Sequence, residues 1–301
     1  MTVDVKTLNC VSLFLLLSFM VFAGPGHAVE DRYFNSNGVK LRYTDQGKGE
    51  AVVLIPGLLG TVETNWEMPG IISRLSKEYR VIGMDLRAHG KSGKPKDALA
   101  YGMEMVKDVV RLLDHLKIKK AHVASYSYGG TIALKLLATY PERLHSVILG
   151  ETSWAEEGND EVNDFYESLA RSLDEGKGFG PLMKSLTPEG EKPPPEEELK
   201  KMTEEISRDF DLKALSALLR GSRELTVAEP ALKSNKVPCL LIYGTKSSPS
   251  SEAALSLGKA MQNLEIHKIE GADHFSALFC PEFLQAVEKF LYDKRLRNLA
   301  E

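Results

Sequence analysis

At residues 122–134 the chain reads HVASYSYGGTIAL, and this stretch decides how the rest of the sequence is interpreted. A strand-like run enters the turn and a helix-like run leaves it. A serine at such a turn is typical of a nucleophile exposed above a sheet, and it needs small residues two positions before and after it. Ser125 and Gly129 meet this need around Ser127, whereas Val123 is too large to do so for Ser125. Ser127 is therefore the predicted nucleophile, with an ordinary structural turn as the alternative.

Short apolar or β-branched runs alternate with helical patterns on both sides of this turn. We expect strands at residues 51–55, 80–84, 121–125, 147–150, 238–243 and 265–269. Most of them lack strict apolar–polar alternation, as expected of strands buried on both faces. A hairpin is predicted over residues 32–45, where Asn37-Gly38 tolerates the positive φ of a tight turn. Helical spacing at residues 106–116 and 283–291 completes an alternation that predicts an α/β fold with a mostly parallel sheet.

The alternation stops between residues 152 and 236. Helical patterns cover residues 162–173, 196–210 and 212–225, and the run Lys192-Pro193-Pro194-Pro195 interrupts them. Residues 151–236 contain 12 basic and 20 acidic residues, a balance of −8 that leaves +4 for the remainder. A long helical insertion between two strands is typical of a lid over a site, and an acidic solvated decoration is the alternative. We expect one core from residues 29–151 and 237–301 and a helical cap from residues 152–236.

The overall composition excludes one class of function, nucleic-acid binding. With 301 residues the chain is long enough for a sizeable core, and 43% hydrophobic and 27% charged residues are ordinary for a globular protein. The 38 basic and 42 acidic residues give a net charge of −4, and no basic run is present. The chain therefore lacks the electrostatic footprint of a nucleic-acid-binding protein.

The N-terminus carries an unbroken apolar run. Residues 11–23 read VSLFLLLSFMVFA, which is shorter than the roughly 20 residues that a membrane span needs. Gly26 and Ala28 provide small residues for a cleavage site beyond the run. We therefore predict a signal peptide over residues 1–28 and an exported protein, periplasmic or secreted. Asp4 weakens the basic flank, so an uncleaved membrane anchor stays open, and a buried helix is a third reading.

The three cysteines indicate neither a disulfide framework nor a metal site. Cys10 would leave with the signal peptide, Cys239 starts an expected strand, and Cys280 lies near the start of the last expected helix. Two buried thiols are expected in the mature chain, although an exported protein leaves their pairing open. No nucleotide, flavin or metal motif is present, so no cofactor is expected.

Five segments resemble the α/β-hydrolase superfamily, in its capped, esterase-like serine-hydrolase branch. They read LIPG (54–57), MDLRAHGKS (84–92), SYSYGG (125–130), YPERLHSVIL (140–149) and GADHF (271–275), in the order that the family has them. The resemblance covers the chain from about residue 32 to residue 291. It implies an eight-stranded sheet of order 1-2-4-3-5-6-7-8 with a helical cap after strand six. The motifs are specific to the fold and much less specific to the substrate.

The resemblance also implies the site residues. The family takes one oxyanion N–H from the residue after the nucleophile and another from a loop after strand three, which correspond to Tyr128 and Leu58. Pro56 replaces the usual histidine of that loop but leaves the N–H of Leu58 in place, with an ordinary Pro-Gly turn as the alternative. His274 stands where the family places its general base, and a structural histidine is the alternative. His89 falls within the 84–92 turn.

The carboxylate of the family's triad is missing from its usual place. An Asp three residues after the glycine that ends strand seven normally orients the histidine and stabilises its charge. Here Ser247 stands three residues after Gly244 and cannot carry that charge. Glu151, directly after the strand beside the nucleophile strand, is the predicted replacement, because some dehalogenases of this fold take their acid from there. Asp273, next to His274, is a second candidate, and complete loss of the acid is the third option.

These features predict an exported serine hydrolase that cleaves a small or medium carboxylic ester, or an amide, through a Ser127 acyl-enzyme. His274 is the expected base and Glu151 the expected acid. A serine at the nucleophile position disfavours dehalogenase chemistry, which uses Asp there. The rival interpretation is a non-catalytic or weakly active binding protein on the same scaffold, favoured by Ser247. The sequence names neither the substrate nor the oligomeric state.

Overall fold

The structure is a computed structural model that describes residues 30–188, 190–247 and 256–298. The predicted signal peptide, residues 1–28, lies outside the described residues, as does Cys10. None of the helices in the described part of the chain is both long and apolar enough to cross a bilayer.

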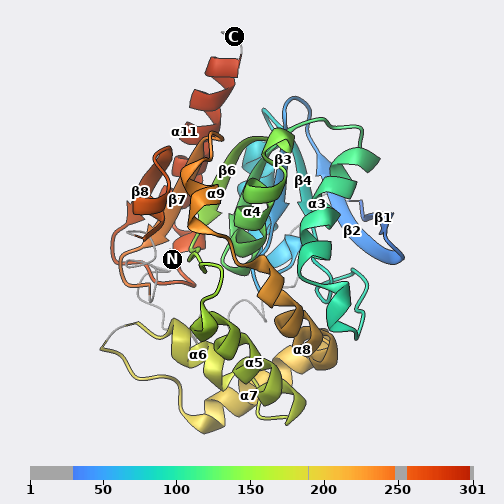
Figure 1. Cartoon of the computed structure of the whole chain (residues 1–301), viewed down its shortest axis with the longest axis vertical. Helices are drawn as coiled ribbons and strands as arrows, with labels where there is room; N and C mark the ends of the chain where they lie inside the picture. The colour runs from blue at the N-terminus through green and yellow to red at the C-terminus, as the bar shows by residue number, and fades with distance from the viewer. Residues whose placement is uncertain (1–29, 189, 248–255, 299–301) are drawn as a thin grey trace, which may run out of the picture.

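Eight strands form one sheet in the order β1-β2-β4-β3-β5-β6-β7-β8, which confirms the α/β-hydrolase fold and its expected topology (Figure 1). The strands are β1 (Arg32–Ser36), β2 (Val39–Gln46), β3 (Ala51–Ile55), β4 (Arg80–Met84), β5 (Ala121–Tyr126), β6 (Leu144–Gly150), β7 (Cys239–Gly244) and β8 (Leu264–Ile269). β2 runs antiparallel to both of its neighbours, and all other pairs are parallel. The predicted hairpin joins β1 to β2, with φ of 50° at Asn37 and 85° at Gly38. Both angles lie in the region that this dipeptide tolerates.

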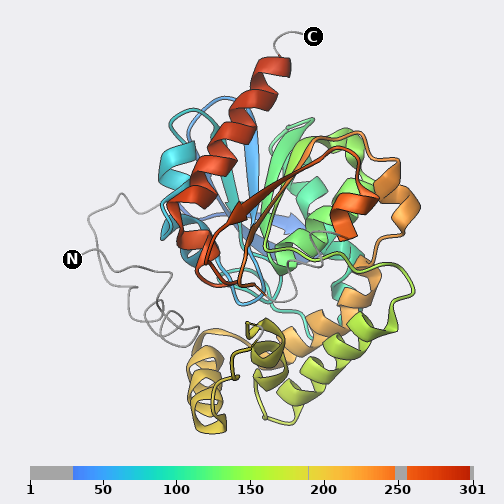
Figure 2. The same ribbon diagram turned by 90° about the vertical axis from the view of Figure 1, so that its left-hand side faces the viewer.

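Helices cover both faces of the sheet, so successive strand residues enter different halves of the core. Val53 and Ile55 pack with α3 (Met103–His115) and α4 (Tyr128–Thr139) on one face. Val52 and Leu54 pack with α2 (Ile71–Leu75) and α11 (Pro281–Asn298) on the other. Figure 2 shows α11 lying along its face of the sheet.

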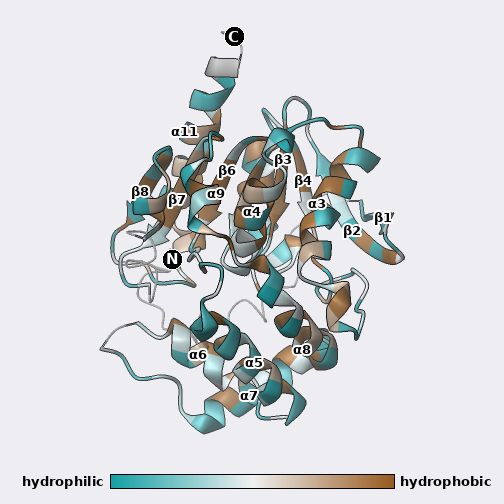
Figure 3. Ribbon diagram, in the orientation of Figure 1, coloured by the Kyte–Doolittle hydropathy of each residue, from teal (hydrophilic) through white to brown (hydrophobic). Residues whose placement is uncertain are grey.

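The central strands are buried along their whole length. Every residue of β3, β5 and β7 is buried, as expected of strands covered on both faces. Figure 3 shows this as hydrophobic colour on the central strands, with hydrophilic colour on the outer surfaces of the helices. Cys239 and Cys280 are both buried thiols, as expected.

A helical insert, which we define as residues 152–236, separates β6 from β7. It contains α5 (Asp160–Asp174), α6 (Gly180–Leu186), α7 (Glu196–Asp209), α8 (Leu212–Gly221) and α9 (Glu229–Lys233). α5 to α8 gather beyond one end of the sheet (Figure 1). The proline run precedes α7, and Pro195 caps that helix, so the prolines lie outside it as expected. The short helices α2, α6 and α9 were not predicted, since five to seven residues carry too little periodicity to identify a helix.

Candidate active site

Ser127 lies in a strained turn between the end of β5 and the start of α4. Its backbone has φ of 50° and ψ of −119°, a region that side-chain-bearing residues rarely adopt. The Ser127 N–H donates to the carbonyl of Gly150, 2.7 Å away, which ties the turn to the end of the neighbouring strand. The hydroxyl is half-buried, at the carboxyl ends of the parallel strands. This geometry is that of a nucleophile turn.

The two small neighbours of Ser127 are required by close packing. A Cβ on Gly129 would lie 2.4 Å from the carbonyl oxygen of Pro56 and 2.5 Å from that of Ile55, so only glycine allows α4 to approach β3. Ser125 is fully buried, and its hydroxyl donates to the carbonyl of Ile148 at 2.8 Å. Of the two serines in the motif, Ser125 is therefore engaged in the core while Ser127 faces the site.

His274 stands in the loop after β8 and contacts Ser127 directly. Its Nε2 lies 2.9 Å from the Ser127 Oγ. The hydroxyl of Tyr126 donates to the His274 carbonyl at 2.7 Å, and the ring of Tyr126 packs against the imidazole. The histidine is thus held by the strand that carries the serine. The structure brings together these two side chains, 147 residues apart, in a hydrogen bond.

Glu151 reaches the other side of the same imidazole. Its Oε2 lies 3.4 Å from His274 Nδ1, and its side chain is completely buried. Its Oε1 accepts a hydrogen bond from the N–H of Gly244 at 2.6 Å, which orients the carboxylate from the adjacent strand β7. Glu151 has φ of 49°, so both it and Ser127 have strained backbones, as functional residues often do.

The other candidate acids are placed differently. Asp273 accepts hydrogen bonds from the N–H groups of Phe275 and Ser276 and from the Ser276 hydroxyl, so its carboxylate shapes the loop that carries His274. Ser247 is 5% exposed, and its hydroxyl has no hydrogen-bond partner among the described residues. Its N–H donates to the Gly244 carbonyl and closes the turn after β7. Of the three options for the triad acid, Glu151 is the one whose carboxylate lies beside His274 Nδ1.

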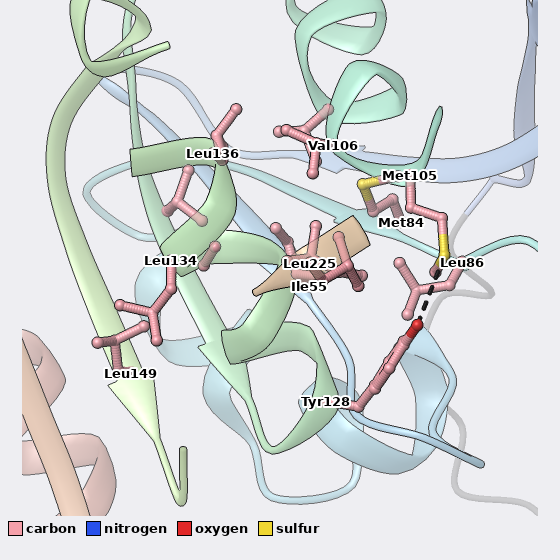
Figure 4. Packing of buried hydrophobic residues seen from close by; sticks show 14 of the residues in the cluster. Ile55, Met84, Leu86, Met105, Val106, Tyr128, Leu134, Leu136, Leu149 and Leu225 are labelled. Carbon is pink, nitrogen blue, oxygen red and sulfur yellow. Dashed lines mark hydrogen bonds between the residues drawn. The ribbon is translucent and has the colours of Figure 1, made fainter. Parts of the chain in front are cut away.

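The two expected oxyanion donors flank the serine. Tyr128 is the first residue of α4, and its side chain points away into the core, where the hydroxyl lies 2.6 Å from the Ser222 Oγ and 3.8 Å from the Met105 sulfur (Figure 4). Leu58 follows Gly57, whose hypothetical Cβ would lie 3.2 Å from the Ser127 Cβ. Within the described residues, no acceptor takes the backbone N–H of Leu58 or of Tyr128. Both N–H groups are therefore available to an oxygen above Ser127.

A pocket of about 230 Å³ opens beside Ser127 and His274. The insert supplies Leu182, Met183, Leu186, Glu205, Ile206, Asp209 and Phe210, and the core supplies Gly57, Leu58, Leu59, Gly60, Thr64, Asn65, Tyr126, Leu278, Phe279 and Phe275. The walls are mainly apolar, with carboxylates at Glu205 and Asp209. No lysine or arginine of the described residues lines it. The pocket fits an apolar molecule without negative charge.

Two side chains that support the loop beside Ser127 were not predicted to do so from the sequence. Asn65 lies in a π-helical turn, Glu63–Glu67, and its Oδ1 accepts the N–H of Gly57 at 2.8 Å. His89 accepts the N–H of Leu59, so it does more than hold its own turn. These are hydrogen bonds between distant segments, and no local spacing marks them. In the described ranges, no group of three or more His, Cys, Asp or Glu side chains is arranged to hold a metal ion.

Several of the known proteins that this chain resembles are hydrolases. The family model described as alpha/beta hydrolase fold matches residues 50–279. Serine hydrolase BPHL of Homo sapiens is 33% identical over 172 residues, which cover 52% of this chain and 59% of that protein. A 3-oxoadipate enol-lactonase of Acinetobacter baylyi is 27% identical, over 71% of this chain and 79% of the lactonase. The chain spans about half or less of the length of most of the curated relatives that it matches. It covers 43% of a Bacillus subtilis synthase, for example.

Solved structures agree with the fold. A thermophilic esterase from Thermogutta terrifontis superposes with a TM-score of 0.70 and 25% identity, covering 88% of this chain and 99% of the esterase. A carboxylesterase of Nitrososphaera gargenis superposes with a TM-score of 0.71 at 18% identity, covering 89% of this chain and 100% of that one. At that lower identity the likeness concerns the fold alone.

Proposed function

This chain belongs to the α/β-hydrolase fold family, and from that premise we propose that it is a serine hydrolase that forms an acyl-enzyme on Ser127. The proposed substrate is a small or medium carboxylic ester, or alternatively an amide. One observation carries the proposal: Ser127 Oγ lies 2.9 Å from His274 Nε2, and His274 Nδ1 lies 3.4 Å from Glu151 Oε2. The names of two relatives agree with it, a human serine hydrolase and a Thermogutta esterase.

In the acylation step, Ser127 Oγ attacks the ester carbonyl carbon while its proton passes to His274 Nε2. The carbonyl oxygen becomes an oxyanion, which accepts hydrogen bonds from the backbone N–H groups of Leu58 and Tyr128. The imidazolium that forms is stabilised by the Glu151 carboxylate at 3.4 Å. His274 then gives the proton to the departing alkoxide, so that an alcohol leaves and the acyl group stays on Ser127.

Deacylation repeats these steps with water as the nucleophile. His274 Nε2 takes a proton from the water as its oxygen attacks the acyl carbon, and the oxyanion again forms beside Leu58 and Tyr128. The imidazolium returns the proton to Ser127 Oγ as the acyl–oxygen bond breaks. A carboxylic acid leaves and the free enzyme is restored.

The pocket supports the size and charge of the proposed substrate. Its volume of about 230 Å³ is below the range of about 300–1,000 Å³ for sites that hold drug-sized ligands. The apolar lining favours an alkyl or aryl group. The carboxylates of Glu205 and Asp209 disfavour an anionic substrate, because like charges repel across a partly dry pocket.

A binding protein that has lost catalysis is the rival function, and the absence of an acid at Ser247 is the observation that favours it. Glu151 argues against this rival because its buried carboxylate lies where the missing Asp would act, beside His274 Nδ1. The two functions differ in one measurable property, which is turnover that depends on Ser127.

Hydrolysis of a chromogenic ester series, from acetate to octanoate, tests the proposed function. Ser127→Ala should abolish turnover, because it removes the nucleophile. Ser125→Ala is the matched control, since it removes a buried hydroxyl two residues away while keeping the residue small. Turnover should survive in the control. Equal activity of Ser127→Ala and the wild type would exclude the proposed acyl-enzyme, and absence of turnover in all three proteins would favour the binding protein.

We also propose that the protein is exported. The apolar run of residues 11–23 and the small residues after it support a signal peptide over residues 1–28, cleaved to give a periplasmic or secreted enzyme. Retention of the same segment as a membrane anchor is the alternative.

A further inference from the structure

The loop that presents Leu58 is a strained four-residue turn. The N–H of Gly60 donates to the carbonyl of Gly57 at 3.0 Å and closes the turn. Leu59, at its third position, has φ of 62°. A positive φ at that position is typical of a type II turn, which prefers Gly or Asn there. For a leucine this conformation is strained, so the surroundings must hold it in place.

Two side chains from other parts of the chain hold this turn. Asn65 Oδ1 accepts the N–H of Gly57 at 2.8 Å, and His89 Nε2 accepts the N–H of Leu59 at 3.0 Å. Gly60 is engaged within the turn. Leu58 is left as the residue of the turn whose N–H has no acceptor among the described residues. The turn therefore keeps one donor unpaired, and that donor is the proposed oxyanion ligand.

The hydrogen bonds of His89 define its protonation. The Nδ1 atom lies 2.9 Å from the Arg87 carbonyl, which can only accept, so Nδ1 carries the hydrogen. The N–H of Leu59 can only donate, so Nε2 carries none. His89 is fully buried, and this burial lowers its pKa to about 4. The ring is therefore neutral at neutral pH, as its acceptor role requires.

The same ring contacts the helical insert. Phe210, which follows α7 and lines the pocket, packs edge-on against His89 with ring centroids 5.6 Å apart and an interplanar angle of 78°. Such edge-to-face pairs stabilise the packing beyond the effect of the area that they bury. His89 is thus held between the insert on one side and the Leu58 turn on the other.

We propose that His89 is a positioning residue for the oxyanion hole: by accepting the Leu59 N–H, it holds the turn of residues 57–60 in the form that leaves the Leu58 N–H unpaired beside Ser127. This inference rests on the proposed function. Without the acceptor, the partly buried Leu59 N–H loses its partner, and a flip of the Leu58–Leu59 peptide relieves the positive φ. The flip turns the Leu58 carbonyl and the Leu59 N–H. The Leu58 N–H, which belongs to the neighbouring Gly57–Leu58 peptide, then loses the rigid turn that holds it beside Ser127.

The experiment compares His89→Leu, which removes the acceptor, with His89→Gln, whose Oε1 can accept in place of Nε2. His122→Leu is the matched control, because His122 is also fully buried but lies near the start of β5, away from Ser127. kcat and KM are measured with a chromogenic ester. The second measurement is the ratio of inhibition constants for an alkyl trifluoromethyl ketone and the corresponding alcohol. Only the ketone forms a tetrahedral oxyanion on the serine, so this ratio reports the oxyanion hole itself.

Losing one oxyanion donor costs about 10²–10³ in kcat. We expect His89→Leu to lower kcat by about that factor, to leave KM within about threefold, and to reduce the ketone preference by a similar factor. His89→Gln should recover most of the preference, and His122→Leu should keep all of it. His89→Phe, which fills the space without an acceptor, replaces His89→Leu if that variant does not fold.

An unchanged ketone preference in the variants without the acceptor would overturn the inference while Ser127-dependent turnover still supports the proposed function. Equal losses in His89→Leu and His122→Leu would also overturn it, because the effect would then be general destabilisation. A His89→Gln variant as impaired as His89→Leu would contradict the acceptor role. If the wild type shows no Ser127-dependent turnover, the proposed function fails and the inference fails with it.

Discussion

Replacing Glu151 with glutamine removes one negative charge from beside His274 and keeps the size of the side chain. The N–H of Gly244 donates to Oε1 at 2.6 Å, and in Glu151→Gln the amide oxygen keeps that hydrogen bond. The amide NH₂ must then occupy the place of Oε2 and face His274 Nδ1. The variant therefore tests the carboxylate with little disturbance of the strand ends that hold it.

Two effects determine how much activity Glu151→Gln should lose. At 3.4 Å, a carboxylate and an imidazolium attract by about 5 kcal/mol at an effective dielectric constant of about 20. That attraction exists only while His274 carries the serine proton, so it raises the rate by a factor of about 10³–10⁴. The amide adds a second effect, because a donor facing Nδ1 favours the tautomer with hydrogen on Nε2. That tautomer cannot accept the proton of Ser127.

The assay is kcat and KM for a chromogenic ester, with thermal unfolding as the test of an intact fold. Glu151→Gln should lower kcat by about 10²–10⁴ with little change in KM, since the interaction is made in the transition state. Glu157→Gln, an exposed glutamate six residues away, is the control and should behave as the wild type. Ser247→Asp alone should gain little activity, because His274 already has a partner carboxylate and a second one nearby would be repelled.

The double variant Glu151→Gln/Ser247→Asp tests whether a carboxylate at position 247 can replace that of Glu151. In the Glu151→Gln background, Ser247→Asp should restore part of the lost activity, because two acids that serve one histidine do not act independently. Suppose instead that Glu151→Gln is silent and Ser247→Asp alone raises activity strongly. The triad acid would then be absent from the natural chain, and the rival interpretation as a degraded hydrolase would be favoured.

The remaining predictions concern charge selectivity, pH and export. Glu205→Gln should raise the ratio of kcat/KM for an anionic ester to kcat/KM for its neutral counterpart by about threefold, because one repulsive charge leaves the pocket. Equal changes in kcat/KM for both esters would contradict this prediction. Burial lowers the pKa of His122 to about 4. Since the unfolded chain takes up that proton near pH 6.5, stability should fall by up to about 3 kcal/mol as the pH drops from about 6.5 to 4. The melting temperature of His122→Leu should decline less steeply over that range, and an equal slope would contradict the assignment. Intact mass of the protein from its native host should place the N-terminus near Val29, whereas a cytoplasmic species that retains Met1 would refute export.

The serine turn could be predicted because its requirements are local. A strand-like run, a helix-like run and small residues at Ser125 and Gly129 lie within a few positions of one another. The structure supplies the reason for the glycine, which is the approach of α4 to within contact of the Pro56 carbonyl. The order of the strands followed from the resemblance to the family, and the observed sheet matches it.

From the sequence, the choice of the acid that pairs with His274 could be narrowed to a few options but not decided. The sequence leaves three options for the acid, because adjacency of β6 and β7 does not tell how far a glutamate side chain reaches. The contact depends on the strained backbone of Glu151 and on the Gly244 N–H that turns its carboxylate toward the imidazole. Neither feature leaves a pattern in the chain.

The supports of the Leu58 turn could not be predicted at all. Asn65, His89 and Phe210 lie 7, 31 and 152 positions beyond Leu58, and each contact depends on how a loop or the insert packs in three dimensions. The short helices of the insert have the same origin. α6 and α9 are stabilised by packing, as buried Met183 and Leu232 show, more than by their own seven and five residues.

Mass spectrometry after reaction with a fluorophosphonate shows whether Ser127 is an activated nucleophile, because this reagent modifies only an activated serine. We expect one phosphonyl adduct per chain, located by peptide mapping on Ser127. His274→Ala should be labelled far more slowly, because the general base is gone. An intact, folded protein that stays unmodified, or an adduct on a peptide without Ser127, would contradict the assignment of this chain as a serine hydrolase.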